Sequence, residues 1–348
     1  MLQNIAPQSL LKISICIPTY NRANLIGATL DSILTQITEE CEVVISDNAS
    51  SDSTAEVVSR YVSRSSRIRY IRNEINIGAD RNYDRVVELS RGEYCWLMTD
   101  DDVMKPGAIE AVLNAISAYD YSLVAVNAEK RNFDLSRVLV PRIYDILEDR
   151  VYLPEDADRL AVDGYCLIVV CCLVLKRTVW LSRTRDLYYG SMFLHVGVIF
   201  QQPLPSPALM IAAPLITHRD GHVRTFWSEL FELSMIKWPS LVWSFPLGRE
   251  AKKQICSREP WKNLSLLLLF RGAGWYSFSE YKKFVRPRLR VRRDGIVPAL
   301  VSLLPGRILN TLLILYYSIA RLCVGRLPFW RVWVLYLQLS PFYIGRRS

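Results

Sequence analysis

Several features that would mark particular classes of protein are absent from this 348-residue sequence. None of its eight cysteines forms a C-x-x-C pair, and most lie in apolar runs. Buried free thiols are therefore expected, rather than a disulfide scaffold or a zinc site. No apolar run reaches the roughly 20 residues of a membrane-spanning helix. The N-terminus has no apolar segment followed by a cleavage site, so we expect no signal peptide and a cytoplasmic location.

Positive charge is in excess only at the C-terminal end. The net charge is +9, yet residues 281–348 hold thirteen basic residues and one acid, Asp294, and so carry +12. The apolar runs 264–270 and 308–320 flank a basic run at 282–293, and residues 329–347 mix arginine with aromatic residues. This combination predicts a region that lies on an anionic membrane surface.

Two other interpretations of the C-terminal region stay open. Its apolar residues could form the core of a helical subdomain, with the basic residues as a solvated rim. Basic and aromatic residues also occur together in nucleic-acid-binding proteins, but the density of apolar residues argues against that function. We expect a peripheral location on the inner face of the cell membrane and no nucleic-acid partner.

Strand-like and helix-like segments alternate through the first half of the chain. This alternation predicts βαβ units and a Rossmann-like α/β fold, with a mostly parallel sheet and flanking helices. The expected strands are residues 13–17, 41–46, 68–71, 94–98 and 121–126, with later candidates at 167–175 and 207–216. Helices are expected over residues 25–37, after a capping box of Ser53 and Glu56, after Gly78, and from Pro106 onward.

The second half looks different. Residues 131–164 are polar and predicted to be irregular, and helices dominate from Trp227 onward. The chain therefore divides into an α/β domain at residues 1–240 and a helical, basic, apolar region at 241–348.

Three polar clusters follow predicted strands. They are residues 18–22 (Pro-Thr-Tyr-Asn-Arg), 47–52 (Asp-Asn-Ala-Ser-Ser-Asp) and 100–102 (Asp-Asp-Asp). Each alone has the composition of an ordinary loop or helix cap. Because ligands bind at the carboxyl ends of strands in doubly wound sheets, all three are expected to line one site.

The acidic cluster is the sharpest of these signals. Adjacent carboxylates repel one another and raise each other's pKa unless a cation lies among them. Oxygen ligands favour Mg²⁺ or Mn²⁺, which usually keep open positions for substrate phosphates. A helix cap needs one acid, not three, so the cluster predicts a site for a metal ion and a diphosphate.

Five motifs in register resemble family 2 glycosyltransferases of the GT-A fold, over about residues 12–225. They are Ile-Pro-Thr-Tyr-Asn-Arg (17–22), Ser-Asp-Asn-Ala-Ser-Ser-Asp-Ser-Thr (46–54), Asn-Ile-Gly-Ala-Asp-Arg-Asn (76–82), Gly-Glu-Tyr (92–94) and Asp-Asp-Asp-x-x-x-Pro-Gly (100–107). Within the family, the sequence most resembles enzymes that add a 3,6-dideoxyhexose such as abequose in O-antigen synthesis. The resemblance implies a metal-dependent hexosyltransferase with a nucleoside diphosphate sugar donor and a polyprenyl-diphosphate-linked oligosaccharide acceptor.

The resemblance also implies roles for individual residues. Asp102 would bind the metal directly with Asp100 beside it, and Asp101 would reach the ribose or a water. The residues expected around the nucleotide sugar are Pro18, Thr19, Tyr20, Arg22, Asp47, Asn48, Gly78, Arg81, Asn82, Asp101, Arg219 and His222. His218 and His222 could instead form a zinc pair, but the sequence shows no third ligand.

Asn48 departs from the family pattern, because many relatives carry an acid there that faces the base. A carboxylate only accepts hydrogen bonds, whereas an amide also donates and could serve the N3 acceptor of cytosine. A CDP-sugar donor is therefore favoured.

The catalytic base is the weak point of the resemblance. Inverting relatives carry an acidic pair in the second half, and here that region reads Asp186-Leu-Tyr-Tyr-Gly-Ser-Met-Phe-Leu-His195. Asp186 and His195 are the candidates, although a single histidine on an apolar face is more often a core residue. Inversion and retention at the anomeric carbon both stay open.

Two rival functions remain. A nucleotidyltransferase also combines a doubly wound sheet with a carboxylate–metal site, but it would need a glycine-rich phosphate loop after the first strand. Residues 18–22 contain no glycine. A catalytically inactive, membrane-associated scaffold is the other rival, and the intact acidic cluster argues against it.

Overall fold

The computed structural model describes residues 11–220, 229–289 and 291–324. The chain forms two compact units, Met1–His222 with Ser244–Ile255, and Val223–Trp243 with Cys256–Ser348. The boundary predicted near residue 240 falls within helix α9 (Trp238–Ser244). His222 and the aromatic, arginine-rich residues 329–347 lie outside the described residues.

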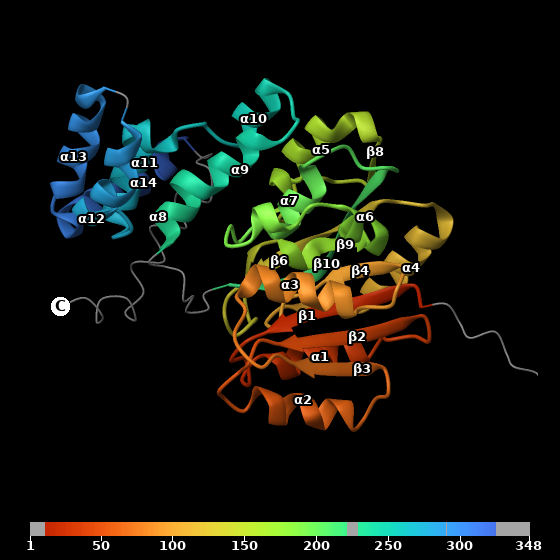
Figure 1. Ribbon diagram of the computed structural model, residues 1–348. Coiled ribbons are helices and arrows are strands. Elements are labelled where there is room, and N and C mark those ends of the chain that lie inside the picture. Colours follow the sequence, from red (N-terminus) through yellow and green to blue (C-terminus); the bar gives the residue numbers. More distant parts are fainter. Residues whose placement is uncertain (1–10, 221–228, 290, 325–348) are drawn as a thin grey trace, which may run out of the picture. The chain divides into compact units, whose positions relative to one another are not determined.

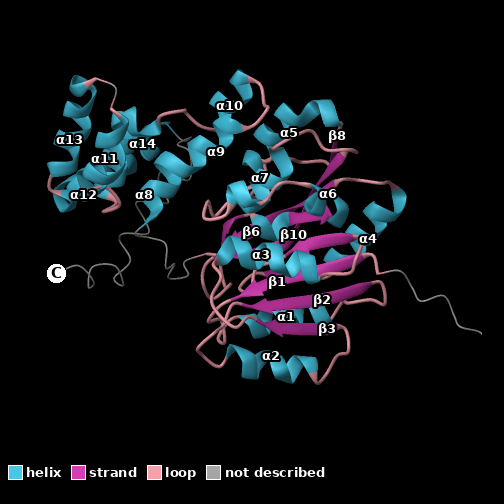
Figure 2. Cartoon of the chain, in the orientation of Figure 1, coloured by secondary structure: helices cyan, strands magenta, loops and turns pink. Residues whose placement is uncertain are grey.

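Among the described residues, ten strands build one sheet in the first unit (Figure 2). The strand order is β3-β2-β1-β4-β9-β6-β10-β5, with β7 beside β6 and β8 beside β10. Strands β3, β2, β1 and β4 pair in parallel with one another, and β6 pairs in parallel with β10, whereas β9 runs antiparallel to both β4 and β6. The predicted mostly parallel α/β fold is confirmed. The strands are β1 Ile13–Thr19, β2 Cys41–Asp47, β3 Ile68–Arg72, β4 Tyr94–Leu97, β5 Val103–Met104, β6 Leu123–Arg131, β7 Val138–Val140, β8 Arg150–Tyr152, β9 Leu173–Lys176 and β10 Ala208–Arg219.

Amphipathic helices flank this sheet (Figure 1). Helix α4 shows the pattern, because Ile109, Val112, Leu113 and Ile116 recur at helical spacing and are all buried. The helices of the first unit are α1 Ile26–Leu34, α2 Thr54–Val62, α3 Ala79–Leu89, α4 Ala108–Ala118, α5 Ala157–Asp163, α6 Arg177–Ser182, α7 Leu194–Phe200 and α10 Arg249–Ile255.

One predicted capping interaction and one predicted helix start are wrong. Ser53 precedes α2, but its side chain makes no capping bond, and the backbone N–H of Thr54 donates instead to Asp52 Oδ1 at 3.0 Å. Helix α4 begins at Ala108 rather than Pro106, because Gly107 has a left-handed φ of 79° that a helix cannot include.

The middle of the chain also differs from its prediction. The apolar run 167–175 forms a strand only from Leu173, because Tyr165, Cys166 and Leu167 have positive φ and the chain makes short 3-10 turns there. Residues 131–164, predicted to be irregular, contain β7, β8 and α5.

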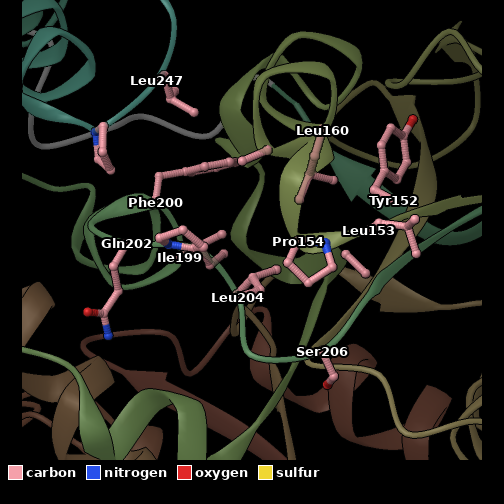
Figure 3. Close-up of a pocket in the computed structure, with 14 residues that line it drawn as sticks. Tyr152, Leu153, Pro154, Leu160, Ile199, Phe200, Gln202, Leu204, Ser206 and Leu247 are labelled. Carbon is pink, nitrogen blue, oxygen red and sulfur yellow. The ribbon is translucent and has the colours of Figure 1, made fainter.

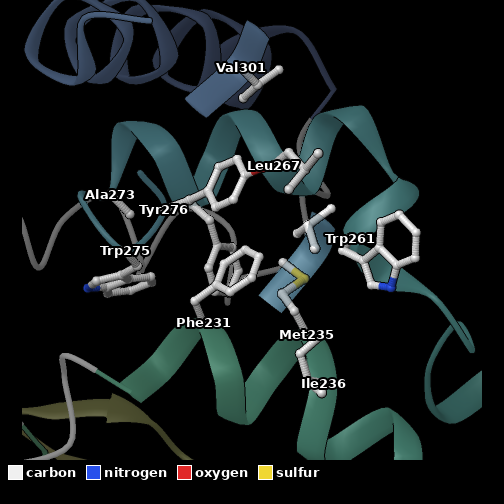
Figure 4. Packing of buried hydrophobic residues seen from close by; sticks show 11 residues of the cluster. Phe231, Met235, Ile236, Trp261, Leu267, Ala273, Trp275, Tyr276 and Val301 are labelled. Carbon is white, nitrogen blue, oxygen red and sulfur yellow. The ribbon is translucent and has the colours of Figure 1, made fainter. Parts of the chain in front are cut away.

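The second unit is helical over its described residues, as predicted, and has its own core (Figure 4). Phe231 stacks on Tyr276 with ring centroids 4.7 Å apart, and Phe270, Trp275 and Val301 are buried in the same cluster. The helices are α8 Leu230–Glu232, which continues through a π turn at Leu233–Lys237 into α9, then α11 Leu264–Gly272, α12 Phe278–Glu280, α13 Ile296–Leu303 and α14 Gly306–Val324.

Within the described residues, helices α13 and α14 each expose aliphatic side chains, and we call these side chains together the α13–α14 face. Its members are between 56% and 62% exposed, and they are Ile296, Leu300, Leu303, Ile308, Leu312 and Leu315. No single described helix has the length and apolarity to cross a membrane. The helices at Arg293–Leu303 and Gly306–Leu313 pass that test only as a pair, with a bend of 89° between them.

Candidate active site

The three predicted polar clusters meet at one edge of the sheet. The parallel register pairs Thr19 with Asp47 and Cys16 with Leu97, so the loops after β1, β2 and β4 all leave the sheet at the same edge. Arg22 of the first loop brings its Nε to 3.3 Å from Oδ1 of Asp100 in the third. The predicted convergence is therefore confirmed.

The loop after β1 is fastened to the loop after β2. Asn21 has a left-handed φ of 54°, and its side-chain oxygen accepts a bond from the backbone N–H of Ser51 at 2.7 Å. The backbone N–H groups of Asn21 and Arg22 donate in turn to the hydroxyls of Ser50 (2.9 Å) and Thr54 (2.8 Å). These bonds give residues 18–22 a fixed shape.

The predicted nucleoside pocket starts in this loop. Thr19 is buried, and its carbonyl accepts a bond from the backbone N–H of Asn48 at 2.8 Å. Pro18 pairs with Ser46 of β2, and Tyr20 is 42% exposed. Tyr20 therefore offers an accessible aromatic ring beside the acidic cluster.

Asp102 is fully buried within a shell of donors. Its carboxylate accepts bonds from the Thr99 hydroxyl at 2.5 Å and the backbone N–H of Arg219 at 2.8 Å, and His218 Nδ1 lies 3.0 Å away. Burial opposes ionisation, but His218 and these donors outweigh it and lower the pKa of Asp102 to about 2. Burial likewise opposes the charge on His218, and Asp102 and Cys171 overcome it, raising the pKa of His218 to about 10. The two side chains form an ion pair in which Asp102 is fully buried and His218 is partly exposed.

Asp100 and Asp101 lack such compensation. Burial and repulsion from Asp101 raise the pKa of Asp100 to about 7, against the opposing charge of Arg22. Burial and the charge of Asp102 likewise raise the pKa of Asp101. Unbalanced carboxylates of this kind indicate a place where a cation would be stabilised.

His218 is a residue at this edge that sequence reasoning did not include among the expected site residues, because it was considered only as half of a possible zinc pair. Strand β5 pairs Val103 with Thr217 in antiparallel register, and this pairing brings Asp102 beside His218. No local sequence pattern predicts a two-residue strand whose pairing partner lies more than a hundred residues away in the chain. Cys171 was missed for the same reason, and its thiol lies within 4.8 Å of ligand atoms of both Asp102 and His218.

Arg219 braces the acidic loop from β10. Its Nε donates to the carbonyl of Asp101 at 2.9 Å, and its guanidinium also donates to the carbonyl of Phe133. The side chain, 8% exposed, therefore lies at the site, and its described bonds hold the protein's own backbone.

The polar side chains at the ends of β2 and β3 are occupied within the protein. Asn48 donates from Nδ2 to Asn76 Oδ1 at 2.8 Å, and its oxygen accepts from the backbone N–H of Ile77 at 2.9 Å. Asn82 donates to the carbonyl of Ser46 at 2.8 Å and is 2% exposed. The buried carboxylate of Asp47 accepts from the backbone N–H of Ser50 and from the Tyr70 hydroxyl.

Helix α3 ties this network to residues 180–192. Gly78, with a φ of 87°, precedes the helix, and exposed Arg81 lies over the ring of Tyr189 at 4.2 Å from its centroid. Asp84 accepts from Trp180 Nε1 at 2.8 Å, and Asp80 accepts from the backbone N–H of Met192 at 3.0 Å.

The two candidate bases have contrasting surroundings. Asp186 is exposed in a 3-10 turn. His195 is buried in the first turn of α7, donates from Nε2 to the carbonyl of Ile168 at 3.2 Å, and has its pKa lowered to about 4 by burial. Among the described residues, no hydrogen bond or ion pair joins either side chain to the acidic cluster.

A small apolar pocket lies between β8, α5 and α7 (Figure 3). Tyr152, Leu160 and Phe200 line it, together with Ala208 at the start of β10. Since Arg219 ends the same strand, the pocket and the acidic cluster belong to opposite edges of the sheet. None of the predicted site residues lines this pocket.

Sequence comparisons agree with the geometry. Residues 14–179 match the model of the family Glycosyl transferase family 2. Abequosyltransferase RfbV of Salmonella typhimurium is 30% identical over 199 residues, which make up 54% of this chain and 60% of that protein. The GalNAc(5)-diNAcBac-PP-undecaprenol beta-1,3-glucosyltransferase of Campylobacter jejuni is 31% identical over 103 residues, 29% of this chain and 33% of that protein. The chain thus spans less than two thirds of the length of either relative.

Solved structures share the fold over nearly the whole chain. Residues 1–349 of S. aureus TarS superpose with a TM-score of 0.57 at 13% identity, covering 97% of this chain and 92% of that one. The complex of the same protein with UDP-GlcNAc gives a TM-score of 0.57 at 14% identity, covering 96% and 91%. At this identity the likeness establishes the fold alone. The chain therefore has the GT-A fold, and its residues 14–179 belong to glycosyl transferase family 2.

Proposed function

We propose that this protein transfers a sugar from a nucleoside diphosphate sugar to a lipid-linked oligosaccharide in O-antigen or related polysaccharide synthesis. The observation that carries the proposal is the convergence of the loops after β1, β2 and β4 on a buried acidic cluster that also contacts His218. Such an edge combines a groove for a nucleotide with charge for a metal–diphosphate.

The residues at this edge fit Mn²⁺ or Mg²⁺. Asp102 and His218 would bind the ion directly, and Asp100 and Asp101 would contribute the surrounding negative charge. Carboxylate oxygen suits both cations and imidazole nitrogen also binds Mn²⁺, and the raised pKa values of Asp100 and Asp101 reflect burial and mutual repulsion that Arg22 does not offset. When bound, the ion supplies positive charge beside the leaving diphosphate.

The donor's nucleoside would lie against Pro18, Thr19 and Tyr20. A cytidine donor remains attractive because Asn48 is an amide, but its donor and acceptor atoms already bind Asn76 and Ile77. Recognition of cytosine by this amide would need an exchange of partners on binding. CDP is therefore one of the nucleotides to test. We propose that Arg22, Arg81 and Arg219 supply positive charge to the diphosphate.

The nature of the sugar and the acceptor is supported by the two bacterial relatives. The name of one specifies abequose as the transferred sugar, which favours a deoxyhexose donor here. The other is named for an undecaprenol-diphosphate-linked acceptor. We propose an acceptor of that chemical class, which is anchored in a membrane.

The α13–α14 face would bring the enzyme to that membrane. It exposes six large aliphatic residues, and the exposed cations Lys282, Lys283, Arg286 and Arg293 belong to the same unit. Exposed aliphatic side chains accompanied by basic residues suit the boundary between the acyl chains and the anionic headgroups of a membrane. This arrangement supports our proposal of peripheral binding on the inner face of the cell membrane.

His195 and Asp186 stay the proposed bases. The base variant should lose turnover by about 10²- to 10⁴-fold while nucleotide binding persists. His195→Gln and Asp186→Asn, measured side by side for both turnover and nucleotide binding, identify which side chain has this signature. If neither variant shows it, the base is a different group.

The test of the proposed function is thermal stabilisation by CDP, UDP, GDP and dTDP, each with and without Mn²⁺. A ligand that binds only the folded state raises the melting temperature. We expect one nucleotide to do so in a metal-dependent way in wild type and in Asp163→Asn, and not in Asp102→Asn. Asp163 is a matched control because it is also ion-paired, to Arg150 at 2.7 Å, and belongs to α5.

Product analysis separates the rival functions. A glycosyltransferase releases the nucleoside diphosphate from a sugar nucleotide, whereas a nucleotidyltransferase releases pyrophosphate from a nucleoside triphosphate. Absence of any nucleotide-induced shift in a folded protein would favour the inactive scaffold.

A further inference from the structure

A third potential metal ligand joins Asp102 and His218 at the sheet edge. The carboxylate of Asp102, the imidazole of His218 and Sγ of Cys171 all lie within 4.8 Å of one another. The three side chains come from different parts of the chain: the loop before β5, strand β10, and the 3-10 turn Val170–Cys172. No spacing motif in the sequence links them.

The fold holds Cys171 at this point through backbone interactions. Strand β9 is antiparallel to β4 and pairs Leu173 with Leu97, so residues just before β9 lie at the carboxyl end of β4. The indole N–H of Trp96 in β4 donates to the carbonyl of Cys171 at 2.9 Å. Cys171 and Asp102 are both fully buried, so neither side chain is placed by chance at an exposed surface.

We propose that Cys171 is a ligand of the metal together with Asp102 and His218, and that the site therefore accepts Zn²⁺ and other thiophilic divalent ions as well as Mn²⁺. This inference rests on the metal site of the proposed function and adds a ligand to it. Thiolate, imidazole and carboxylate are the three ligand types of protein zinc sites.

The spacing of the three side chains suits a four-coordinate ion. Metal–ligand bonds of about 2.0–2.3 Å in a tetrahedron set the donor atoms roughly 3.3–3.8 Å apart, and the observed limit of 4.8 Å is a small adjustment from that. Three protein ligands leave the fourth position for a water or a phosphate oxygen of the donor. Binding would displace the thiol proton and the proton between His218 and Asp102, and both pass to solvent.

The adjacent cysteine provides a matched control. Cys172 is equally buried and lies in the same turn, but it interacts with Tyr144 and is not part of the three-ligand group. Serine at position 171 removes a ligand, whereas serine at position 172 makes the same change of volume and polarity one residue away.

The test is Co²⁺ binding to full-length, metal-free protein without nucleotide, because a thiolate bound to Co²⁺ gives a sulfur-to-metal charge-transfer absorption in the near ultraviolet. We expect this absorption in wild type and in Cys172→Ser, and its loss in Cys171→Ser. In calorimetry, Cys171→Ser should weaken Cd²⁺ binding by at least about tenfold and change Mn²⁺ binding much less. Retained Mn²⁺ binding also establishes that the variant is folded.

Two results would overturn the inference in different ways. If Co²⁺ binds through Asp102 and His218 without the charge-transfer absorption, and Cys171→Ser binds Cd²⁺ like wild type, Cys171 is only a buried neighbour. The proposed function then stands. If wild type binds neither Co²⁺ nor Mn²⁺, the metal site itself is wrong. Turnover of a sugar nucleotide, measured in parallel, decides the proposed function independently.

Discussion

Two regions of the first unit each contain a histidine, buried His195 and partly buried His218, and the two histidines differ in charge state. His195 in α7 is surrounded by apolar residues, bonds to a backbone carbonyl, and has a pKa of about 4. His218 in β10 faces the carboxylate of Asp102 and has a pKa of about 10. Near neutral pH, the first is uncharged and the second carries a proton.

The difference separates packing from chemistry. A neutral, hydrogen-bonded histidine in an apolar environment is what a folded core tolerates. An ion pair with a fully buried carboxylate, beside two carboxylates whose pKa stays raised despite Arg22, is costly to assemble and is more typical of a functional site. Variants around His218 are therefore expected to affect turnover through the metal site, whereas variants of His195 are expected to affect stability whether or not His195 is also the base.

Replacing Asp102 is the most direct test of this contrast between the regions around His218 and His195. Asp102→Asn keeps the size of the side chain but removes the charge that pairs with His218 and would bind the metal. We expect turnover of a sugar nucleotide to fall roughly 10²- to 10³-fold. Steady-state kinetics at saturating Mn²⁺ measure the effect. Asp163→Asn should be within twofold or so of wild type, and equal losses in both variants would contradict the assignment.

The pH dependence of stability tests whether His195 is uncharged in the folded protein. Because His195 stays neutral in the folded state down to about pH 4, the unfolded chain binds a proton first as the pH falls below about 6.5. The free energy of unfolding should therefore drop by about 3 kcal/mol between pH 6.5 and 4, with no contribution above pH 6.5.

Urea denaturation across this pH range measures the effect as the difference between wild type and His195→Gln. Glutamine can still donate to the Ile168 carbonyl but does not titrate, so the acid-side loss should be smaller in the variant. The His218→Gln variant should keep the acid-side loss. Parallel pH profiles for wild type and His195→Gln would show that burial does not hold His195 neutral.

The fold was predictable where local patterns agree with long-range pairing. The apolar runs before Pro18, at Cys41 and at Tyr94 became parallel strands because each is short, buried and followed by a turn. The run at 167–175 has the composition of a strand, but positive φ values at residues 165–167 interrupt it. The composition of this run indicates that it is buried, but it does not predict the backbone conformation.

The site, like the fold, was predictable only where its signal is local in the sequence. Asp100, Asp101 and Asp102 are adjacent in sequence, so their mutual repulsion can be read without a structure. The partners of Asp102 cannot, because His218 and Cys171 reach it through β10 and the turn before β9. Asn48 and Asn82 were expected to contact the nucleotide, and only the structure reveals how fully the protein itself uses their amides.

Asn82 tests whether a polar residue that is bonded within the protein contributes to stability rather than to nucleotide binding. Its oxygen accepts from Ser46 Oγ at 2.7 Å and Asn73 Nδ2 at 3.0 Å, and alanine would remove the acceptor of the buried Ser46 hydroxyl and one of the two acceptors of Asn73 Nδ2. Asn82→Ala should lower the free energy of unfolding by about 1–3 kcal/mol, while the nucleotide-induced thermal shift persists. Asn132→Ala, in a surface turn with Ser136, is the control and should change stability little. Unchanged stability with a lost nucleotide shift would instead make Asn82 a binding residue.

A milder version of the same contrast exists in the second unit, where Phe231 and Tyr276 are covered and the leucines of the α13–α14 face are not. If that face enters a membrane, Leu300→Asp should weaken binding to anionic vesicles about tenfold, because burying one leucine stabilises by about 1.5 kcal/mol or more. Vesicle co-sedimentation measures the change. Leu187→Asp is the control, since Leu187 is 79% exposed but belongs to the first unit.

The salt dependence of vesicle binding separates the two contributions to that surface. Attraction of Lys282, Lys283 and Arg286 to anionic lipid is screened by salt, whereas burial of Leu300 is not. Wild type should therefore lose part of its binding at high salt, and Leu300→Asp should lose nearly all of it. If Leu300→Asp and Leu187→Asp both bind like wild type at every salt concentration, the exposed leucines do not enter the bilayer. The basic residues would then be a solvated rim around a helical core.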